Sequence, residues 1–190
     1  MEVHPNAITN LLLEKIVLDI NISLEESNWR LSQNNWPQNI IEHHVGTCSA
    51  TTPSEQITKE LLGEMGHLLP DTEEVWFSYH HWHKLSGIAK HNDGNHRWGA
   101  TLYLNKHWDI NWGGTFLWEE SEDDWRALNP TSRTLVINTK QQLHMVTPVS
   151  PFAPMDRFTI QMFGKKKPID QFMENIENEF SGQGKSEESN

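Results

Sequence analysis

Hydrophobic residues follow two different spacings in this chain, and the change comes near residue 70. Before it, apolar positions recur every three or four residues. Residues 8–20 show this spacing, with apolar residues at Ile8, Leu11, Leu12, Ile16 and Ile20. The pattern predicts an amphipathic helix or a helix that runs into a strand. Residues 54–62 begin at the N-cap candidate Ser54, and their run ends near Gly66. This second segment is also predicted to be a helix.

After Pro70 the pattern changes to short runs rich in β-branched and aromatic residues, separated by turn residues. These runs occupy residues 75–79, 99–104, 115–118, 134–138, 143–149 and 157–163. Several short strands without intervening helices are typical of an antiparallel sandwich or jelly roll. The predicted fold class is therefore mainly β with flanking helices.

Helical spacing returns at residues 168–180, which predicts a C-terminal helix, and the polar residues 181–190 predict a disordered tail. A chain of 190 residues has room for one core of ordinary size. We expect a single domain over residues 1–180. Residues 1–72 would form a helical or irregular support, and residues from about 73 to 165 would form the jelly-roll core.

Charge and cysteine content limit the classes of partner. The formal net charge is −11, from 26 acidic and 15 basic residues, which repels nucleic acid and anionic membrane surfaces. The single cysteine, Cys48, excludes an intramolecular disulfide. The N-terminus lacks a basic segment before a long apolar run, and no apolar stretch approaches the roughly 18 residues of a membrane span. We expect a cytoplasmic protein, with no nucleic-acid or membrane partner.

The candidate chemistry begins with a His-x-Asp pattern, which occurs twice. With 11 histidines and 26 acidic residues, about 1.5 such matches arise by chance, so context must decide. His91 and Asp93 lie in a polar turn shortly before the strand at 99–104, where both side chains can emerge at one end of a sheet. His107 and Asp109 follow that strand. We interpret this second pair as an exposed hairpin loop.

His144 and Arg157 complete the candidate site. His144 lies in the strand at 143–149, and antiparallel pairing can bring it toward His91 and Asp93. Two imidazoles and one carboxylate are the ligand set of non-haem Fe(II) oxygenases. Arg157 shares one face of its strand with Thr159, where the two would make a bidentate carboxylate site. The alternative is an edge-strand arginine that is solvated or paired with Asp156.

This combination resembles the 2-oxoglutarate- and Fe(II)-dependent oxygenases of the prolyl 4-hydroxylase type. The resemblance runs from about residue 75 to 164 and rests on His91-x-Asp93, residues 101–105, Trp112-Gly113-Gly114, His144 and Arg157-x-Thr159. It implies a double-stranded β-helix, or jelly roll, with helices behind the larger sheet. It also implies Fe(II), 2-oxoglutarate and O2 as cofactors and cosubstrates, with ascorbate as a supporting reductant.

The resemblance assigns roles to individual residues. His91, Asp93 and His144 would bind iron and form the catalytic centre. The distal carboxylate of 2-oxoglutarate would be held by Arg157 and Thr159, with Tyr103 and Tyr79 as further cosubstrate contacts. Leu102 departs from similar sequences, which often have a polar or aromatic residue there. Strand alternation should turn Leu102 away from the face that Tyr103 uses.

The implied reaction is hydroxylation of an unactivated C–H bond with release of succinate and CO2. A prolyl residue in a peptide or protein is the leading substrate, and a free amino acid or small metabolite is the alternative. A non-catalytic metal-binding β-barrel, such as a cupin, is the alternative of a different class. A cupin would have His-x-His, whereas Asp93 stands where the second histidine should be.

One histidine-rich segment remains, Tyr79-His80-His81-Trp82-His83. It suggests a second metal site, but histidines in an extended segment alternate between the two faces of the strand. We therefore favour a polar and aromatic rim around the pocket over a second metal.

Overall fold

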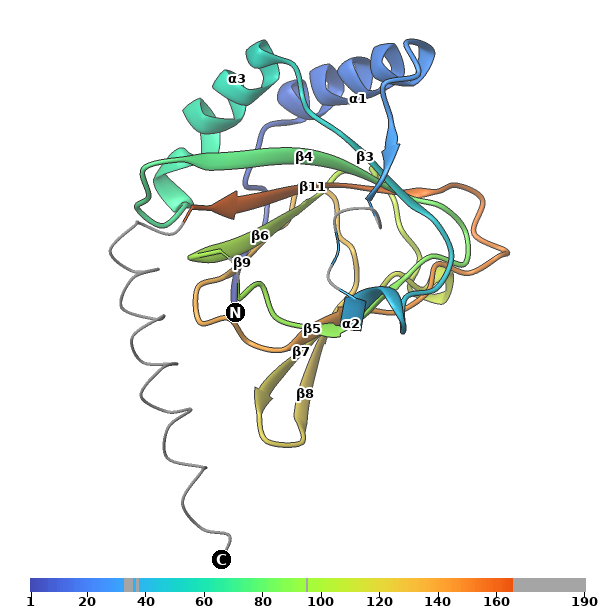
Figure 1. Cartoon of the computed structure of the whole chain (residues 1–190). Helices are drawn as coiled ribbons and strands as arrows, with labels where there is room; N and C mark the ends of the chain where they lie inside the picture. The colour runs from blue at the N-terminus through green and yellow to red at the C-terminus, as the bar shows by residue number, and fades with distance from the viewer. Residues whose placement is uncertain (33–35, 37, 95, 166–190) are drawn as a thin grey trace, which may run out of the picture.

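The computed structural model describes residues 1–32, 36, 38–94 and 96–165 of the chain. They form two antiparallel sheets, with helices packed against the larger one (Figure 1). The C-terminal helix expected at 168–180 and the tail at 181–190 lie outside the described residues.

Eleven strands make up the two sheets of the described chain. The larger sheet runs in the order β1 (Glu2–His4), β9 (Leu135–Asn138), β6 (Trp98–Tyr103), β11 (Arg157–Gly164), β4 (Val75–Trp82), β3 (Cys48–Thr51) and β2 (Arg30–Leu31). The smaller sheet runs in the order β5 (Ile88–His91), β10 (His144–Val146), β7 (Phe116–Ser121) and β8 (Asp124–Leu128). This arrangement confirms the predicted mainly β jelly roll.

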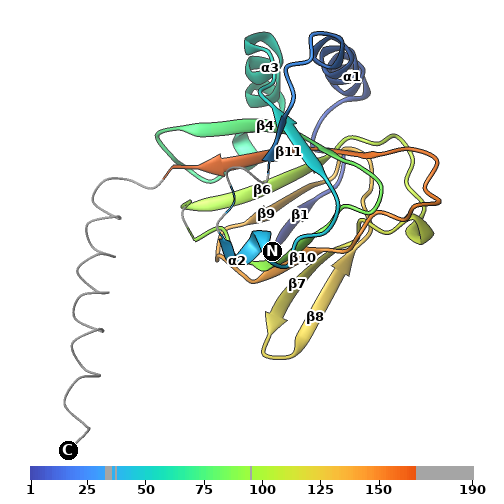
Figure 2. The same cartoon turned by 45° about the vertical axis from the view of Figure 1, so that its right-hand side comes forward.

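Two long helices, α1 (Asn10–Glu25) and α3 (Glu55–Met65), lie side by side over the outer face of the larger sheet (Figures 1 and 2). Thr9 caps α1, because its hydroxyl accepts a hydrogen bond from the Leu12 backbone N–H, and Ser54 caps α3 in the same way. The short helices are α2 (Gln38–Ile41), η2 (Gly66–Leu68) and η3 (Ile110–Trp112). None of the helices in the described part of the chain is long and apolar enough to cross a membrane.

Strand alternation separates an apolar outer face of the larger sheet from a mixed inner face. On β6, Leu102 is buried in the core beneath the helices, whereas its neighbour Tyr103 belongs to a cluster on the opposite face. On β11, Ile160 and Met162 join the helix-covered core, whereas Arg157 lines the space between the sheets. The predicted orientation of Leu102 is thus confirmed, and polar inner positions are left to face a cavity.

The N-terminal segment contributes more than a helical support. Its strands β1, β3 and β2 extend the larger sheet at both edges, with Val3 opposite Val136 and Cys48 opposite Trp82. These strands have two to four residues, too few for a period-two hydrophobic pattern. Main-chain pairing therefore defines them, and the sequence pattern did not predict them.

Candidate metal centre and the cavity around it

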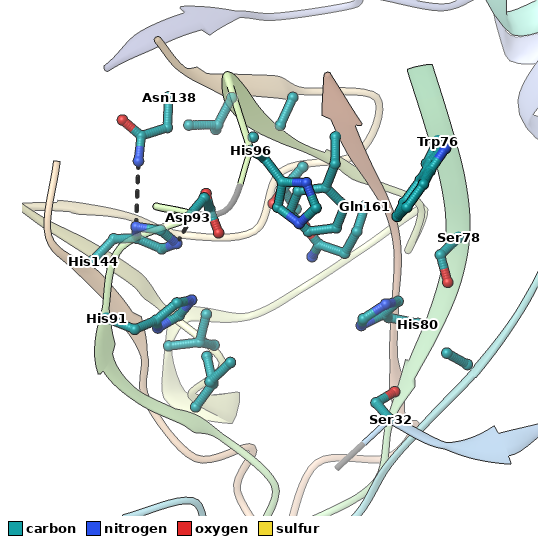
Figure 3. Close-up of a pocket in the computed structure, with 18 of the residues that line it drawn as sticks. Ser32, Trp76, Ser78, His80, His91, Asp93, His96, Asn138, His144 and Gln161 are labelled. Atoms are coloured by element: carbon teal, nitrogen blue, oxygen red, sulfur yellow. Dashed lines mark hydrogen bonds and ion pairs between the residues drawn. The ribbon is translucent and has the colours of Figure 1, made fainter. Parts of the chain in front are cut away.

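Three potential metal ligands converge at the junction of β5 and β10. His91 ends β5, Asp93 lies two residues later, and His144 begins β10 directly opposite His91 in the antiparallel register. One ligand atom from each of the three residues lies within 4.8 Å of the others. His144 Nε2 is 3.7 Å from Asp93 Oδ2. Figure 3 shows the three side chains grouped on one side of the cavity, with His80 across from them.

Hydrogen bonds to the backbone orient both imidazoles. The Nδ1 atom of His91 lies 2.7 Å from the Ala89 carbonyl oxygen, and Nδ1 of His144 lies 3.0 Å from that of Gln142. Because a carbonyl oxygen only accepts, each Nδ1 carries the proton and donates it. Each Nε2 therefore has its lone pair free and directed into the cluster, which is the tautomer a metal requires.

Burial keeps these imidazoles neutral. It lowers the pKa of His91 to about 4, aided by the nearby His144, and it also lowers the pKa of His144. Burial raises the pKa of Asp93, against the opposing effect of His91. A carboxylate in this setting lacks a full counter-charge, and a divalent cation would supply it. The donor set and its protonation states fit a metal such as iron.

Gly99 on β6 gives Asp93 the space it occupies. A Cβ atom built on Gly99 would lie 2.2 Å from Asp93 Oδ2, far inside van der Waals contact. Any larger residue at this position must displace the carboxylate or the strand. The glycine therefore belongs to the geometry of the cluster, although it carries no ligand atom.

Arg157 is the second unusual feature of the cavity. Its side chain is 1 % exposed, and its three guanidinium nitrogens have no acidic partner in the described residues, although the Tyr103 hydroxyl is a polar neighbour. The guanidinium carbon lies 5.4 Å from the centre of the Trp82 ring and 5.2 Å from that of Tyr103. Ring contacts offset only part of the cost of burying a cation. The buried guanidinium therefore lacks an anion that would neutralise its charge.

The surroundings of Arg157 suit a carboxylate. The Tyr103 hydroxyl is buried beside the guanidinium and has no other hydrogen-bond partner in the described chain. Thr159 is fully buried on the same face of β11, where its hydroxyl accepts a hydrogen bond from Trp82 Nε1 at 3.2 Å and keeps its own proton to donate. Arg157, the three ligands and Trp82 all line one cavity of about 930 Å³. Arg157 is buried rather than solvated, which contradicts the edge-strand alternative.

The structure contradicts the role expected for Tyr79. This side chain lies on the outer face of β4, within the core beneath the helices, and its hydroxyl donates to Asp19 Oδ2 on α1 at 2.9 Å. Neighbouring positions on the strand, Ser78 and His80, line the cavity instead. Since alternate residues of a strand face opposite sides, Tyr79 cannot reach a cosubstrate held by Arg157.

The alternative ligand pair does not converge. His107 is exposed and packs edge-on against the Trp112 ring. Asp109 caps η3 by accepting a hydrogen bond from the Asn111 backbone N–H at 2.8 Å. Neither residue joins a cluster of three potential ligands in the described part of the chain. Their expected position in an exposed loop agrees with the structure.

The histidine-rich segment of β4 is divided between two faces. His80 and Trp82 line the cavity, as expected of a rim. His81 and His83 instead turn to the other side of the sheet, where both approach Asp156. The rim interpretation is therefore wrong for these two residues. The alternation predicted for the segment explains the division.

Sequence reasoning missed several residues of the cavity wall. They come from inner-face positions of the larger sheet and from the segment before β6, and include Trp76, His96, Thr101, Asn138 and Gln161. The same period-two pattern that placed Arg157 and Thr159 on one face also places Gln161 there. The signal was available for Gln161, but not for Asn138, whose strand is uniformly buried.

Residues 76–164 match the sequence profile of the 2OG-Fe(II) oxygenase superfamily. No curated protein sequence matches the chain significantly. Among solved structures, a prolyl-4-hydroxylase from Pseudomonas putida has a TM-score of 0.65 at 13 % identity, with 87 % of this chain and 92 % of that chain covered.

Two further structures show the range of proteins that share this fold. A prolyl hydroxylase from Trichoplax adhaerens, solved with a hypoxia inducible factor peptide fragment, has a TM-score of 0.65 at 14 % identity, covering 86 % of this chain and 82 % of its own. A non-heme alpha ketoglutarate dependent epimerase of nogalamycin biosynthesis has a TM-score of 0.60 at 8 % identity, with 85 % of this chain and 76 % of that chain covered. At such identities the structural likeness shows the fold.

The profile match agrees with the resemblance to the 2-oxoglutarate- and Fe(II)-dependent oxygenases that the sequence suggested, and the chain shares its fold with solved prolyl hydroxylases. The profile match and the cluster of two histidines and one aspartate support the expectation of an enzyme that uses Fe(II), 2-oxoglutarate and O2.

Proposed function

We propose that this chain, whose residues 76–164 match the 2OG-Fe(II) oxygenase superfamily, hydroxylates an unactivated C–H bond of a prolyl residue in a peptide or protein. One observation carries the reaction class: a cluster of two histidines and one aspartate shares a cavity with a buried arginine that has no anion partner. The first feature fits Fe(II), and the second fits a dicarboxylate cosubstrate.

In this proposal each group of side chains has a defined task. His91, Asp93 and His144 hold Fe(II) and leave its remaining positions open. Arg157 pairs with the distal carboxylate of 2-oxoglutarate through two parallel N–H bonds, and the hydroxyls of Tyr103 and Thr159 donate to the same group. When bound, Fe(II), 2-oxoglutarate and O2 together supply an oxidant for unactivated C–H bonds, with release of succinate and CO2.

The cavity wall would exclude water and orient the substrate. Trp76, Trp82 and Phe163 line the larger-sheet side, and Phe116 lines the smaller-sheet side. Flat aromatic rings pack well against a pyrrolidine ring. The prolyl assignment rests on these surfaces and on the prolyl hydroxylases among the solved structures with this fold, one of which was solved with a peptide.

The first test is anaerobic addition of Fe(II) and 2-oxoglutarate to the purified protein. The expected result is a visible metal-to-ligand charge-transfer band that is absent in His144→Ala and weakened in Arg157→Ala. Folded protein that gives no band would refute the oxygenase proposal. The second test incubates the protein with proline-containing peptides and with free amino acids, and follows succinate formation and product mass.

The outcome of the second test separates the substrate classes. A mass gain of one oxygen atom on a peptide proline supports the proposal. The same gain on a free amino acid would replace the peptide substrate with a small metabolite. Substrate-dependent succinate formation without a mass change would indicate an isomerising reaction, as in the epimerase with this fold.

A further inference from the structure

A second group of potential metal ligands lies on the outer face of the larger sheet. His81 and His83 project from the end of β4, and Asp156 comes directly before β11, whose first residues pair with this part of β4. One ligand atom from each of the three residues lies within 4.8 Å of the others. The opposite face of the same strands carries Trp82 and Arg157 into the cavity. The sheet therefore separates this group from the proposed iron site.

Two imidazoles share a single carboxylate oxygen in this group. Asp156 Oδ2 lies 2.7 Å from His81 Nε2 and 3.3 Å from His83 Nδ1. The two imidazole rings have centroids 3.9 Å apart. A structural hydrogen bond from His81 to Asp156 would need only one of these histidines. The approach of the second histidine to the same oxygen is the feature that needs an explanation.

Neighbouring contacts hold the three side chains in place. The His81 ring stacks on Phe158 with a centroid distance of 4.3 Å. The hydroxyl of Ser49 lies 3.4 Å from Nε2 of His83, on the side of the ring away from Asp156. The backbone of Asp156 is fixed through Asn105, whose amide donates to its carbonyl oxygen at 2.9 Å. Such contacts orient ligands before a metal arrives.

We propose that His81, His83 and Asp156 form a second metal site, which takes a zinc-type divalent cation and is independent of the proposed iron site. Nitrogen and oxygen ligands of a tetrahedral zinc ion lie roughly 3.4 Å apart. The 3.3 Å separation to His83 already fits this geometry. The 2.7 Å separation to His81 needs a small opening by side-chain rotation. Solvent supplies the fourth ligand.

Charge and access support this assignment. Burial lowers the pKa of His81, with a further contribution from His83, in spite of the opposing effect of Asp156. The ring is therefore neutral near pH 7 and can exchange its shared proton for a metal. The side chains of His81, Asp156 and His83 are 13 %, 27 % and 39 % exposed, so a cation can reach them from solvent. Two imidazoles and one carboxylate suit zinc better than magnesium or calcium.

The site has a direct mechanical link to the cavity. Asp156 is the residue before Arg157, and β11 begins at that arginine. A metal held by Asp156 and by two residues of β4 would bridge the ends of two neighbouring strands. It would therefore fix the backbone from which Arg157 enters the opposite face. We infer a clamp on this edge of the cavity, not a second catalytic centre.

Zinc titration of the full-length chain tests the proposal. We expect two equivalents of Zn²⁺ per wild-type chain, because the iron ligands also accept zinc. The variant His91→Ala/His144→Ala should bind one equivalent. Adding His83→Ala should remove that equivalent, and Asp156→Asn should do the same. His67→Ala, an exposed histidine on η2, is the matched control and should leave the stoichiometry unchanged. Circular dichroism establishes that each variant is folded.

The result that would overturn the proposal is equally direct. If the folded His91→Ala/His144→Ala variant binds no zinc, or if His83→Ala leaves its zinc equivalent in place, the group is only a hydrogen-bonded cluster. Should the double variant fail to fold, cadmium NMR of the intact chain replaces it. Two cadmium signals are expected, one of which disappears in His83→Gln, and a single signal would refute the site. Neither outcome depends on the proposed hydroxylase activity.

Discussion

His91 and His144 face each other across the β5–β10 pair, with ring centroids 4.3 Å apart, and each directs its Nδ1 at the carbonyl oxygen two residues before it. The same local arrangement occurs on both strands, so both Nε2 atoms point at the same space beside Asp93. Each ring is fixed by its own backbone and not by the other ring. The cluster is therefore organised before a metal binds.

The first prediction concerns the choice between the two His-x-Asp pairs. His144→Ala removes one of three ligands, and we expect Fe(II) affinity to fall by on the order of 100-fold or more, since outer contacts alone are worth about 10- to 100-fold. His107→Ala removes the exposed histidine of the alternative pair and should leave the affinity unchanged. Anaerobic titration with Fe(II) measures both. Equal losses in the two variants would contradict the assignment.

The second prediction follows from the unpaired charge of Arg157. Arg157→Met replaces a buried cation with an unbranched apolar side chain that follows the path of the aliphatic part of arginine. We expect the free energy of unfolding of the ligand-free protein to rise by about 1–3 kcal/mol, because an uncompensated charge leaves the interior. The melting temperature should rise by roughly 2–4 °C per kcal/mol. Thermal unfolding without cosubstrate measures this change.

The same variant must lose its response to 2-oxoglutarate. The wild-type protein should be stabilised further by the cosubstrate in the presence of a redox-inert divalent metal, through mass action on the folded state. Arg157→Met should show no such shift. Arg157→Lys, which keeps the charge but not the bidentate fork, should respond weakly. If 2-oxoglutarate stabilises Arg157→Met as much as it stabilises the wild type, Arg157 has no cosubstrate role. If Arg157→Met is less stable than the wild type without ligand, the arginine is not an uncompensated charge.

Local sequence patterns predicted much of the central fold. The helix at α3 and the strands β4, β6, β7, β9, β10 and β11 match runs with clear hydrophobic spacing. The sequence patterns did not predict β1, β2, β3, β5 and β8, because these strands are short or mostly exposed and have no extended apolar face to detect. For these elements, pairing with a neighbour supplies the stabilisation, and a neighbour cannot be read from local sequence.

The site shows the same division between local and long-range information. The sequence predicted that Arg157 and Thr159 lie on the same face of their strand, because side chains alternate between the two faces. Tyr79 was misplaced because the resemblance that assigned its role does not specify the strand face on which its side chain lies, and that face packs in the core beneath the helices. The approach of Asp156 to His81, 75 positions apart, depends on the pairing of β4 with β11. No local pattern contains that pairing.

The third prediction tests Gly99 as the residue that makes room for the metal ligand. In Gly99→Ala the new methyl group would collide with Asp93 Oδ2 at 2.2 Å, so the carboxylate must move. We expect Fe(II) affinity to fall by on the order of 10- to 100-fold, the range seen when contacts that support a ligand are lost. The far-ultraviolet circular dichroism should remain that of the wild type.

Gly63→Ala is the matched control for this substitution. A Cβ at Gly63 on α3 meets nothing within 4 Å. Alanine there should raise the free energy of unfolding by up to about 1 kcal/mol through helix propensity and should not alter iron binding. If Gly99→Ala binds Fe(II) with the affinity of the wild type, Asp93 can ligate the metal equally well from another position.

The fourth prediction is a pH dependence that originates at His80. Burial lowers the pKa of His80 to about 3, with a further contribution from the positive charge of Arg157. The Cys48 thiol, 3.7 Å from its Nδ1, is itself buried and has its pKa raised to about 12, so it carries no compensating charge. His80 therefore remains neutral in the folded protein at pH values where it is protonated in the unfolded chain.

The sign of the effect follows from proton binding. Between pH 6.5, the ordinary value for histidine, and about 3, the unfolded chain binds a proton at this position that the folded protein does not. Stability must then fall as the pH is lowered through this window. From pH 7 to pH 5 the loss at His80 amounts to about 2 kcal/mol. Buried His91 and His144 add to the loss in the same direction.

His80→Gln isolates the contribution of this residue, because glutamine keeps a polar side chain of similar size and does not titrate. Urea unfolding of the metal-free wild-type protein and of the variant should be compared at pH 7 and pH 5. The difference in unfolding free energy between the two pH values should shrink by about 2 kcal/mol in the variant. An unchanged difference would mean that His80 is protonated in the folded state near pH 5, which would require an anion beside Arg157 in the cavity.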